Sequence, residues 1–184
     1  MHNPMKRKLC REELNSLIHR AFQGRRSIVS VHELNDRWFN SAYALTLDDG
    51  MRTVLKVAPE PAAGMMRYQR SVMKAEVEVL RLLKETGAVP VPRVYYYEAE
   101  TENGHECFLM EFLPGQPYNK VKELLAAEER RQIEEELGQL NRRINTIRSN
   151  RFAYYAQETE QGNDWPTVFA AMVSGLLSMR RTKI

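Results

Sequence analysis

The sequence predicts an α+β fold in which a five-stranded antiparallel sheet with one long helix is followed by a group of helices. Two observations support this prediction. Before residue 113, short segments with the alternation and the β-branched residues of strands are separated by turn residues. After a break at Leu113-Pro114-Gly115, apolar residues recur at helical spacing instead.

The first predicted elements are a helix over residues 11–22 and a strand over residues 27–34. Apolar residues at helical spacing indicate the helix, and Gly24 can end it. Isoleucine and valine give the strand its β-branched character. Residues 35–41 are polar and aromatic and predict a turn or loop.

Two more strands, at residues 42–47 and 53–57, form a predicted hairpin. Asp48-Asp49-Gly50 lies between them and is a tight-turn signal, because glycine accepts a positive φ at no steric cost. Three antiparallel strands in succession are therefore expected.

A long helix is predicted after the third strand, from about residue 66 to residue 86, where Gly87 ends it. Strands over residues 94–99 and 106–112 follow. They are joined through Asn103-Gly104, a favoured hairpin dipeptide. The expected order is three strands, a helix and two strands.

Two longer helices are predicted in the remainder of the chain. The first spans about residues 127–148, with an apolar stripe made of Ile133, Leu137, Leu140, Ile144 and Ile147. Asp164 can cap the second, and Pro166 is acceptable in its first turn. The apolar face of this last helix consists of Trp165, Phe169, Met172, Val173, Leu176 and Leu177. We expect part of these faces, including Leu176 and Leu177, to be exposed, so that the chain forms a homodimer through its C-terminal helices or is marginally stable.

The composition argues against several classes of function. The net charge is +3, from 27 basic and 24 acidic residues, which is too balanced to require a nucleic acid or an anionic membrane. The basic pairs are scattered and lack interleaved aromatic residues, so a solvated surface is favoured over a nucleic-acid-binding stripe. Cys10 and Cys107 have no metal-ligand spacing and favour a reducing, cytoplasmic compartment. No apolar run approaches the ~20 residues that span a bilayer.

Two charged residues fall where the pattern predicts a core. Lys56 shares a strand face with Val54, and Glu76 lies close to Val72 on the apolar face of the predicted helix. A buried carboxylate is costly unless a cation meets it, and the preceding strand supplies Lys56. A strand lysine held by a glutamate of the next helix is a known device for contacting the phosphates of ATP. The alternative is that both residues lie at an edge and extend to water.

The segment from Phe108 to Gly115 ends a strand and crosses into the helical part. Backbone atoms at such a crossing are free to hydrogen-bond the edge of an adenine, and Met110 can form the wall of the pocket behind it. An ordinary strand end followed by a Pro-Gly break is the alternative interpretation.

Several motifs spread over residues 25–178 together carry a family resemblance. They are Trp38-Phe39-Asn40-Ser41-Ala42-Tyr43, Val54-Leu55-Lys56-Val57-Ala58-Pro59, Ala75-Glu76-Val77, Val89-Pro90-Val91-Pro92-Arg93-Val94, Leu109-Met110-Glu111, Leu113-Pro114-Gly115, Glu136-Leu137-Gly138, Ile144-Asn145-Thr146-Ile147 and the Trp165, Phe169 and Met172 helix. With these motifs the sequence resembles the aminoglycoside phosphotransferase and choline kinase-like group of the protein-kinase-like fold, most narrowly the bacterial phosphotransferase enzyme family.

The resemblance implies a division of the chain into four parts. An N-terminal helix at residues 1–24 precedes a kinase-like N-terminal lobe at 25–112. A hinge or linker at 113–119 then leads to a partial helical C-terminal lobe at 120–184. The implied activity is transfer of the γ-phosphate of ATP to a hydroxyl of a small-molecule acceptor.

The resemblance also implies roles for individual residues. The loop at 35–41, including Asn40 and Ser41, would fold over the phosphates of ATP. Lys56 would contact the α- and β-phosphates, with Glu76 holding it. The backbone of Glu111 and Leu113 would bind the adenine, and Val54 and Met110 would line its pocket. The expected cofactor is Mg-ATP.

The sequence departs from the family where the chemistry takes place. The family's catalytic segment reads His-x-Asp followed by an Asn, and a separate Asp binds Mg²⁺. The four histidines, His2, His19, His32 and His105, open no such segment. We therefore expect a chain truncated before the catalytic loop, with no catalytic residue or metal ligand of its own and little activity alone. A non-catalytic nucleotide-binding or regulatory module, and an interaction domain in which Lys56 and Glu76 are structural, remain the alternatives.

Overall fold

The computed structural model describes residues 8–34, 40–59, 72–99, 106–153, 155 and 162–181. Predictions that concern residues 35–39, the start of the long helix at residue 66 and the Asn103-Gly104 turn lie outside the described residues.

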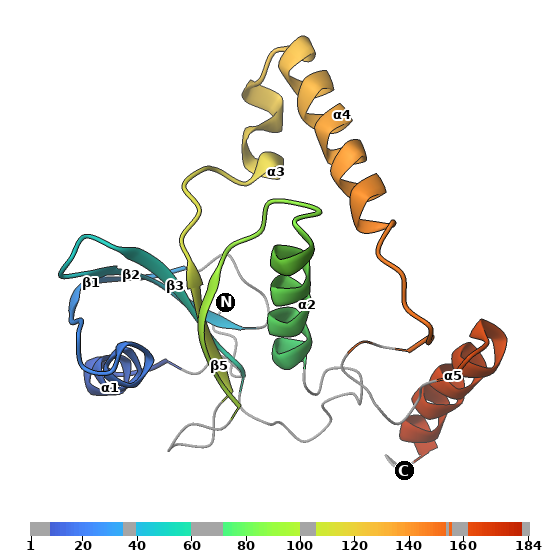
Figure 1. Cartoon of the computed structure of the whole chain (residues 1–184), viewed down its shortest axis with the longest axis horizontal. Coiled ribbons are helices and arrows are strands. Elements are labelled where there is room, and N and C mark those ends of the chain that lie inside the picture. Colours follow the sequence, from blue (N-terminus) through green and yellow to red (C-terminus); the bar gives the residue numbers. More distant parts are fainter. Residues whose placement is uncertain are drawn as a thin grey trace.

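The first half of the chain alternates helices and strands in the predicted order (Figure 1). Helix α1 (Arg11–Phe22) is followed by strands β1 (Ile28–Glu33), β2 (Ser41–Leu47) and β3 (Arg52–Val57). Helix α2 (Val72–Thr86) then precedes strands β4 (Val94–Glu98) and β5 (Cys107–Glu111). The glutamate of the first turn, Glu13, closes the start of α1 by accepting a hydrogen bond from the Cys10 amide at 2.8 Å. Gln23 and Gly24 end α1 with positive φ angles of 54° and 72°.

The five strands form one antiparallel sheet in the order β1-β2-β3-β5-β4. The predicted α+β class with a five-stranded sheet is thus confirmed. The central position of β3 follows from this order, since it pairs with β2 on one side and with β5 on the other. Any residue in the middle of β3 is held by neighbouring strands on both sides.

The sheet has a helix on each of its two faces (Figure 1). On the α1 side, leucines and isoleucine of α1 pack against Leu45, Leu55, Val57 and Leu109. On the α2 side, the helix packs against alternate residues of the same strands, among them Val54, Phe108 and Met110. This period of two divides each strand between two cores.

The buried face of α2 differs from the predicted one. Met73 and Val77 form its centre, whereas Val72 is 44% exposed and Glu76 lies on the flank. The buried centre lies one residue beyond Val72 and Glu76, although Leu83 of the predicted face is buried. Apolar residues make up about half of this helix, and the sheet selects which of them face it. Glu76 consequently sits beside the core instead of inside it.

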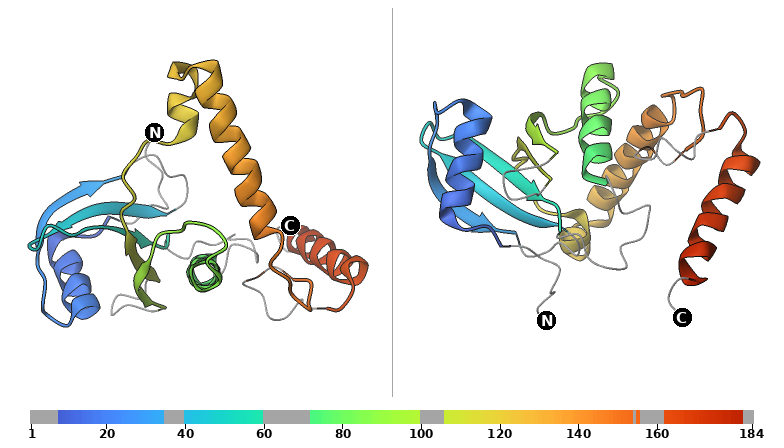
Figure 2. Two further views of the ribbon diagram at one scale, coloured as in Figure 1. Left: turned by 45° about the horizontal axis from the view of Figure 1, so that its top comes forward. Right: turned by 90° about the horizontal axis from the view of Figure 1, so that it is seen from below.

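The second half of the chain is helical (Figure 2). Helix α3 (Tyr118–Val121) and a 3-10 turn (Lys122–Leu124) lead into α4 (Ala127–Ile144), and α5 (Trp165–Arg181) follows a bridged loop. Helix α4 ends at Ile144, earlier than predicted, because a turn forms in which the Ile147 amide donates to the Ile144 carbonyl. Both views show α4 and α5 projecting away from the sheet.

Helix α5 begins as predicted. The Asp164 carboxylate accepts a hydrogen bond from the Thr167 amide at 3.1 Å, and Pro166 occupies the first turn. Val168 and Met172 are buried, whereas Trp165, Phe169 and Leu177 are exposed. Exposure was expected of Leu176 and Leu177, and the Leu176 side chain lies outside those described. Within the described residues, no helix is long and apolar enough to cross a membrane.

Candidate functional site

Lys56 lies in the middle of the sheet, on the face that α2 covers. It stands on β3 between Ala42 of β2 and Phe108 of β5, and only 4% of the residue is exposed. An ammonium group at such a position needs a counter-charge, because removing it from water without one costs several kcal/mol (~5). The identity of that counter-charge decides what the site can do.

The counter-charge is Glu76 of α2. The Lys56 Nζ donates to the Glu76 Oε1, and the Glu76 side chain remains 32% exposed. The Nζ also lies 5.3 Å from the centroid of the Phe108 ring, which places the cation near an aromatic face. The structure therefore brings together the two charged residues that the sequence singled out. The partly exposed carboxylate of Glu76 leaves the ion pair open to solvent from one side.

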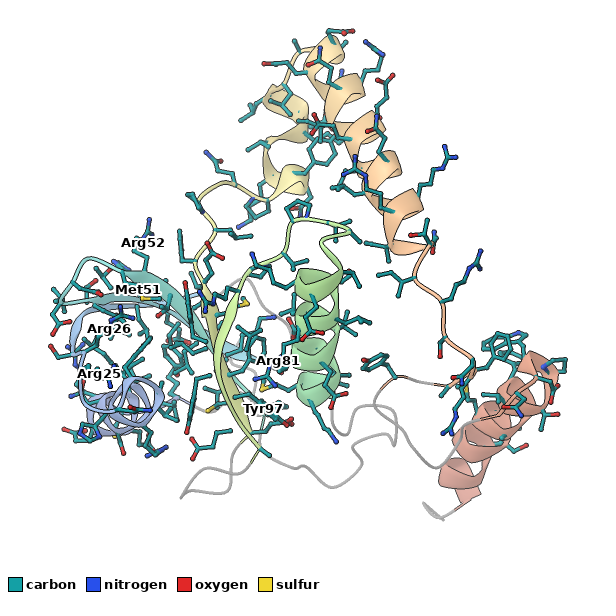
Figure 3. The ribbon with its side chains drawn as sticks, in the orientation of Figure 1. Arg25, Arg26, Met51, Arg52, Arg81 and Tyr97 are labelled. Carbon is teal, nitrogen blue, oxygen red and sulfur yellow. The ribbon has the colours of Figure 1, made fainter. Side chains whose placement is uncertain are left out.

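Neighbours of Lys56 form a row across the sheet. Cross-strand pairing aligns Ala42, Lys56, Phe108 and Tyr97 on β2, β3, β5 and β4. Tyr97 lies between the sheet and α2 (Figure 3), and its hydroxyl donates to the Glu106 Oε1 at 2.7 Å. Burial, aided by this bond to a carboxylate, raises the pKa of the Tyr97 hydroxyl above its ordinary value. The phenol therefore stays neutral at any physiological pH.

A second row contains the two predicted wall residues. Val54 of β3 and Met110 of β5 are cross-strand partners, and both are buried in the cluster that also holds Phe108. On the far side of Val54, β2 presents the small side chain of Ala44. Ala42 and Ala44 thus give this part of the α2 face small side chains. Sequence analysis missed both alanines, because only the strand register shows which β2 residues adjoin Lys56 and Val54.

The segment 111–113, where β5 ends and the hinge begins, carries an unusual hydrogen bond. The Glu111 amide donates to the Arg93 carbonyl at 2.8 Å, as in a regular antiparallel pair. The Arg93 amide donates instead to the Oε2 of the Glu111 side chain at 3.0 Å. This bond takes up the N–H that a regular pair would direct at the Glu111 carbonyl.

The next residues of the hinge are fixed from the other side. The Phe112 amide donates to the Arg52 carbonyl at 3.3 Å, and the Arg52 guanidinium lies 3.7 Å from the centroid of the Phe112 ring. Leu113 follows with an exposed side chain. The hinge segment thus passes beside the first residue of β3 in a defined path.

Asn40 and Ser41 are placed differently from the other predicted site residues. Ser41 is the first residue of β2 and is buried, and it pairs with Val57. This register puts its side chain on the α1 face of the sheet, opposite to Lys56. Asn40 is half-buried directly before the strand. The structure therefore does not bring the Ser41 side chain to Lys56.

Comparisons with known proteins agree with this fold. The sequence matches the phosphotransferase enzyme family over residues 30–177. Two solved structures, the GDP complexes of wild-type and of mutant aminoglycoside 2'-phosphotransferase-IIIa, superpose on 76% of this chain with TM-scores of 0.58. Their sequence identities of 17% and 18% show a shared fold. The sheet, the paired lysine and glutamate and the helices after the hinge define a protein of the kinase-like fold.

The chain belongs to the phosphotransferase enzyme family, because the match covers most of its length. Among curated proteins, two subtelomeric hrmA-associated cluster proteins from Aspergillus fumigatus strains are 26% and 25% identical, over 73% and 75% of this chain. The chain spans only 26% and 27% of those relatives, and 42% and 43% of the two solved structures.

Proposed function

We propose that the α2 face of the sheet binds ATP as the nucleotide part of a small-molecule phosphotransferase, with a hydroxyl of a small acceptor as the target of the γ-phosphate. The observation that carries the proposal is the Lys56–Glu76 pair in the centre of the sheet. The pair holds one ammonium in a fixed direction. In this proposal, phosphate oxygens reach the ammonium from the side on which the Glu76 side chain is partly exposed.

The adenine base would lie between the Val54–Met110 row of the sheet and the segment 111–113. Val54 and Met110 supply apolar contact, while the Glu111 carbonyl and the Leu113 amide supply one acceptor and one donor. The bond from the Arg93 amide to the Glu111 carboxylate supports this arrangement, because it turns one competing donor away from the Glu111 carbonyl. Asn40 and the loop before it remain proposed contacts of the phosphates.

Mg²⁺, which the family implies, finds no ligand set in the part of the chain that the structure describes. No group of three or more His, Cys, Asp and Glu side chains there could hold a metal ion. The 184 residues also contain no His-x-Asp segment. We therefore propose that this polypeptide, by itself, binds ATP but turns it over slowly or not at all.

Calorimetry with Mg-ATP tests the nucleotide site. Lys56→Met is expected to weaken binding at least about tenfold, since one charge-assisted contact to phosphate contributes ~1.5–3 kcal/mol. Glu76→Gln is expected to weaken it less, because the lysine remains. Lys74→Met is the matched control. Lys74 lies on α2, as Glu76 does, and its half-exposed side chain makes only a long ion pair of 3.9 Å with Glu78.

Two results would contradict this proposal. A folded Lys56→Met variant with unchanged affinity would leave Lys56 and Glu76 as a structural pair in an interaction domain. Measurable turnover of ATP with any alcohol by the purified chain would contradict the inactivity but not the binding. Because the solved relatives were captured with GDP, a titration with Mg-GTP is run in parallel to establish which purine is preferred.

A non-catalytic nucleotide-binding or regulatory module is the second candidate function. It is favoured by the same absence of a His-x-Asp segment in the sequence. Nucleotide binding without turnover, retained when the chain is mixed with candidate acceptors, would favour it over the enzyme.

We also propose that the chain self-associates through its C-terminal helices. Leu137 and Ile144 of α4 and Trp165, Phe169 and Leu177 of α5 are exposed, and a large uncovered apolar area marks an interaction surface. In analytical ultracentrifugation, Phe169→Ser is expected to convert a dimer to a monomer. Val29→Ser, an exposed valine on β1, is the control that should not. A wild-type monomer at every concentration would contradict the proposal.

A further inference from the structure

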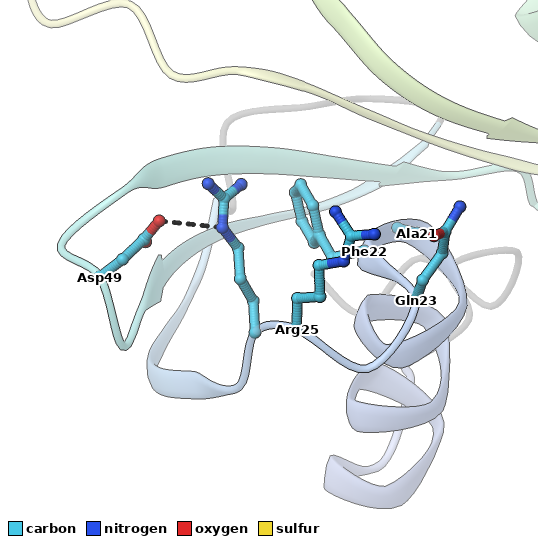
Figure 4. Close-up of a pocket in the computed structure, with 6 residues that line it drawn as sticks. Ala21, Phe22, Gln23, Arg25 and Asp49 are labelled. Atoms are coloured by element: carbon cyan, nitrogen blue, oxygen red, sulfur yellow. Dashed lines mark ion pairs between the residues drawn. The ribbon is translucent and has the colours of Figure 1, made fainter.

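A hollow lies on the other side of the sheet from Lys56, where the end of α1 meets the β2–β3 turn (Figure 4). Its volume is about 550 Å³, and it is lined by Ala21, Phe22, Gln23, Arg25, Arg26 and Asp49. This volume is within the range of about 300–1,000 Å³ that is typical of small-molecule sites. All of these residues except Asp49 precede the segment that matches the family. The hollow therefore belongs mainly to a part of the chain with no assigned role.

The backbone that forms the rim is fixed by its own hydrogen bonds. The Gly24 amide donates to the His19 carbonyl at 2.8 Å, and the Arg25 amide donates to the Phe22 carbonyl at 3.1 Å. The positive φ of Gly24 suits glycine, and an added Cβ would lie 2.8 Å from the His19 Nε2. The turn consequently holds Gln23, Arg25 and Arg26 along the same rim.

Arg26 is held in place by three contacts. Its Nε lies 2.9 Å from the Asp49 Oδ2, and its guanidinium lies 4.6 Å from the centroid of the Phe22 ring. Its Nη1 also lies 2.8 Å from the Met51 Sδ. Figure 3 shows Arg25, Arg26 and Met51 gathered at this end of the sheet. Arg26 thus forms a rigid, neutralised wall of the hollow.

Arg25 carries the charge of the hollow that is left without a counter-charge. Its side chain is exposed, and no carboxylate of the described residues lies within ion-pair distance of it. Asp49 pairs with Arg26, and Asp48 accepts hydrogen bonds from the Ser27 amide and hydroxyl at 3.1 and 2.8 Å. The lining therefore has two guanidinium groups and one carboxylate.

We propose that this hollow binds a small molecule that carries one oxyanion, a carboxylate or a phosphate group, with Arg25 as its principal contact. A guanidinium offers two parallel donors that match the two oxygens of such a group. Phe22 supplies an apolar wall for the remainder of the ligand, and the Gln23 amide supplies a further donor and acceptor. The negative end of α1 and the neighbouring Asp48 oppose any anion, and they oppose it more as its charge increases. Arg25 can offset one such group, whereas a polyphosphate is disfavoured, which separates this ligand from the nucleotide of the α2 face.

The test is a titration of the isotope-labelled full chain followed by amide NMR. Sodium phosphate and sodium acetate are added in separate experiments against sodium chloride at the same ionic strength. Saturable shifts are expected at residues 23–27 and at Asp49 with at least one of the two oxyanions. The anion that saturates identifies the group. Arg25→Gln is expected to weaken this binding at least about tenfold, and Arg148→Gln, a change of another exposed arginine, should leave it unchanged.

The outcome is independent of the nucleotide proposal. Shifts confined to residues around Lys56, shifts that chloride reproduces, or an Arg25→Gln variant with unchanged affinity would each overturn the oxyanion site. None of these results depends on whether ATP binds, because the resonances of the two sites are observed separately. Arg25 is exposed, so its replacement is expected to leave the melting temperature unchanged, which verifies that the variant is folded.

Discussion

The part of the chain from α1 to β5 and the part from α3 to α5 use their apolar residues differently. In the first part, two clusters of buried side chains fill both faces of the sheet. In the second, α4 has no buried residue although its sequence is amphipathic, and α5 buries only Val168 and Met172 among the side chains described. The first part therefore has its own core, whereas the apolar stripes of the second part are largely exposed in the described structure.

The largest expected effect tests this difference directly. Leu55→Ala, in a strand residue that is 1% exposed, is expected to lower the free energy of unfolding by about 2–5 kcal/mol. Leu137→Ala, in a residue of α4 that is 47% exposed, should change it by no more than about 0.5 kcal/mol. Urea denaturation measures both. A large loss for Leu137→Ala would show that α4 is covered in solution.

A pair of glycine replacements should change stability in opposite directions in the two parts. Gly24→Ala forces a side chain into a left-handed conformation and against His19, so we expect it to cost about 1–2 kcal/mol. Gly138 lies inside α4 with nothing within 4 Å of an added Cβ, and Gly138→Ala should stabilise the helix by up to ~1 kcal/mol. Thermal unfolding monitored by circular dichroism compares them. Equal effects of the same sign would mean that the two parts do not differ as described.

The two cysteines distinguish the core from its surface chemically. Burial raises the pKa of the Cys107 thiol to about 12 from an ordinary value of 9.0, whereas Cys10 is exposed. Iodoacetamide at pH 8 should therefore modify Cys10 alone in the folded protein and both cysteines in urea, as mass spectrometry would show. Rapid modification of Cys107 without denaturant would indicate that the sheet opens.

The same shift makes stability depend on alkaline pH. Between pH 9 and about 12 the unfolded chain has lost the thiol proton of Cys107 and the folded chain has kept it. The unfolded state then binds fewer protons, so this group lowers the free energy of unfolding as pH rises through that interval. Cys107→Ala should flatten this part of the pH profile.

The smallest expected effect is local to α5. Asp164→Ala removes the acceptor of the Thr167 amide, and Asp164→Asn keeps one. The pKa of the Asp164 carboxyl is lowered by its hydrogen bonds to Thr167, so its contribution is present at neutral pH and is lost as pH falls through that lowered pKa. Hydrogen exchange should speed up in the first turn of α5 for the alanine variant only, without a change in the exchange of β3.

The sheet was more predictable than the helices that follow it, and the reason is physical. The short run from Val54 to Val57 and the turn signal at Gly50 indicate the hairpin strands from local sequence alone. The Lys56–Glu76 contact was also predictable, because a buried charge demands a partner and the chain order offered one. No local signal distinguishes an apolar stripe that is buried from one that is exposed. The apolar residues of α4 therefore predicted the helix but not the exposure of its apolar side.

Features that depend on register and on rotation of a helix were not predictable. The Ser41 side chain faces away from Lys56 because β2 begins one residue earlier than expected and alternates from there. The buried centre of α2 consists of Met73 and Val77, because packing against the sheet determines which side of the helix is covered. The hollow at Arg25 joins two distant turns and has no signature in either one.

Both outer strands of the sheet meet their neighbours irregularly. The pairing of β1 with β2 shifts register between Ile28 and Ser30, and that of β4 with β5 shifts between Val94 and Tyr96. The pairings that flank Lys56 run in step along their described length. A bulged outer strand bends and offers a broken row of amides and carbonyls, which hinders the docking of a strand from another molecule. The sheet is thus poorly suited to extend into a fibril, even though its cross-strand ladder is continuous at the centre.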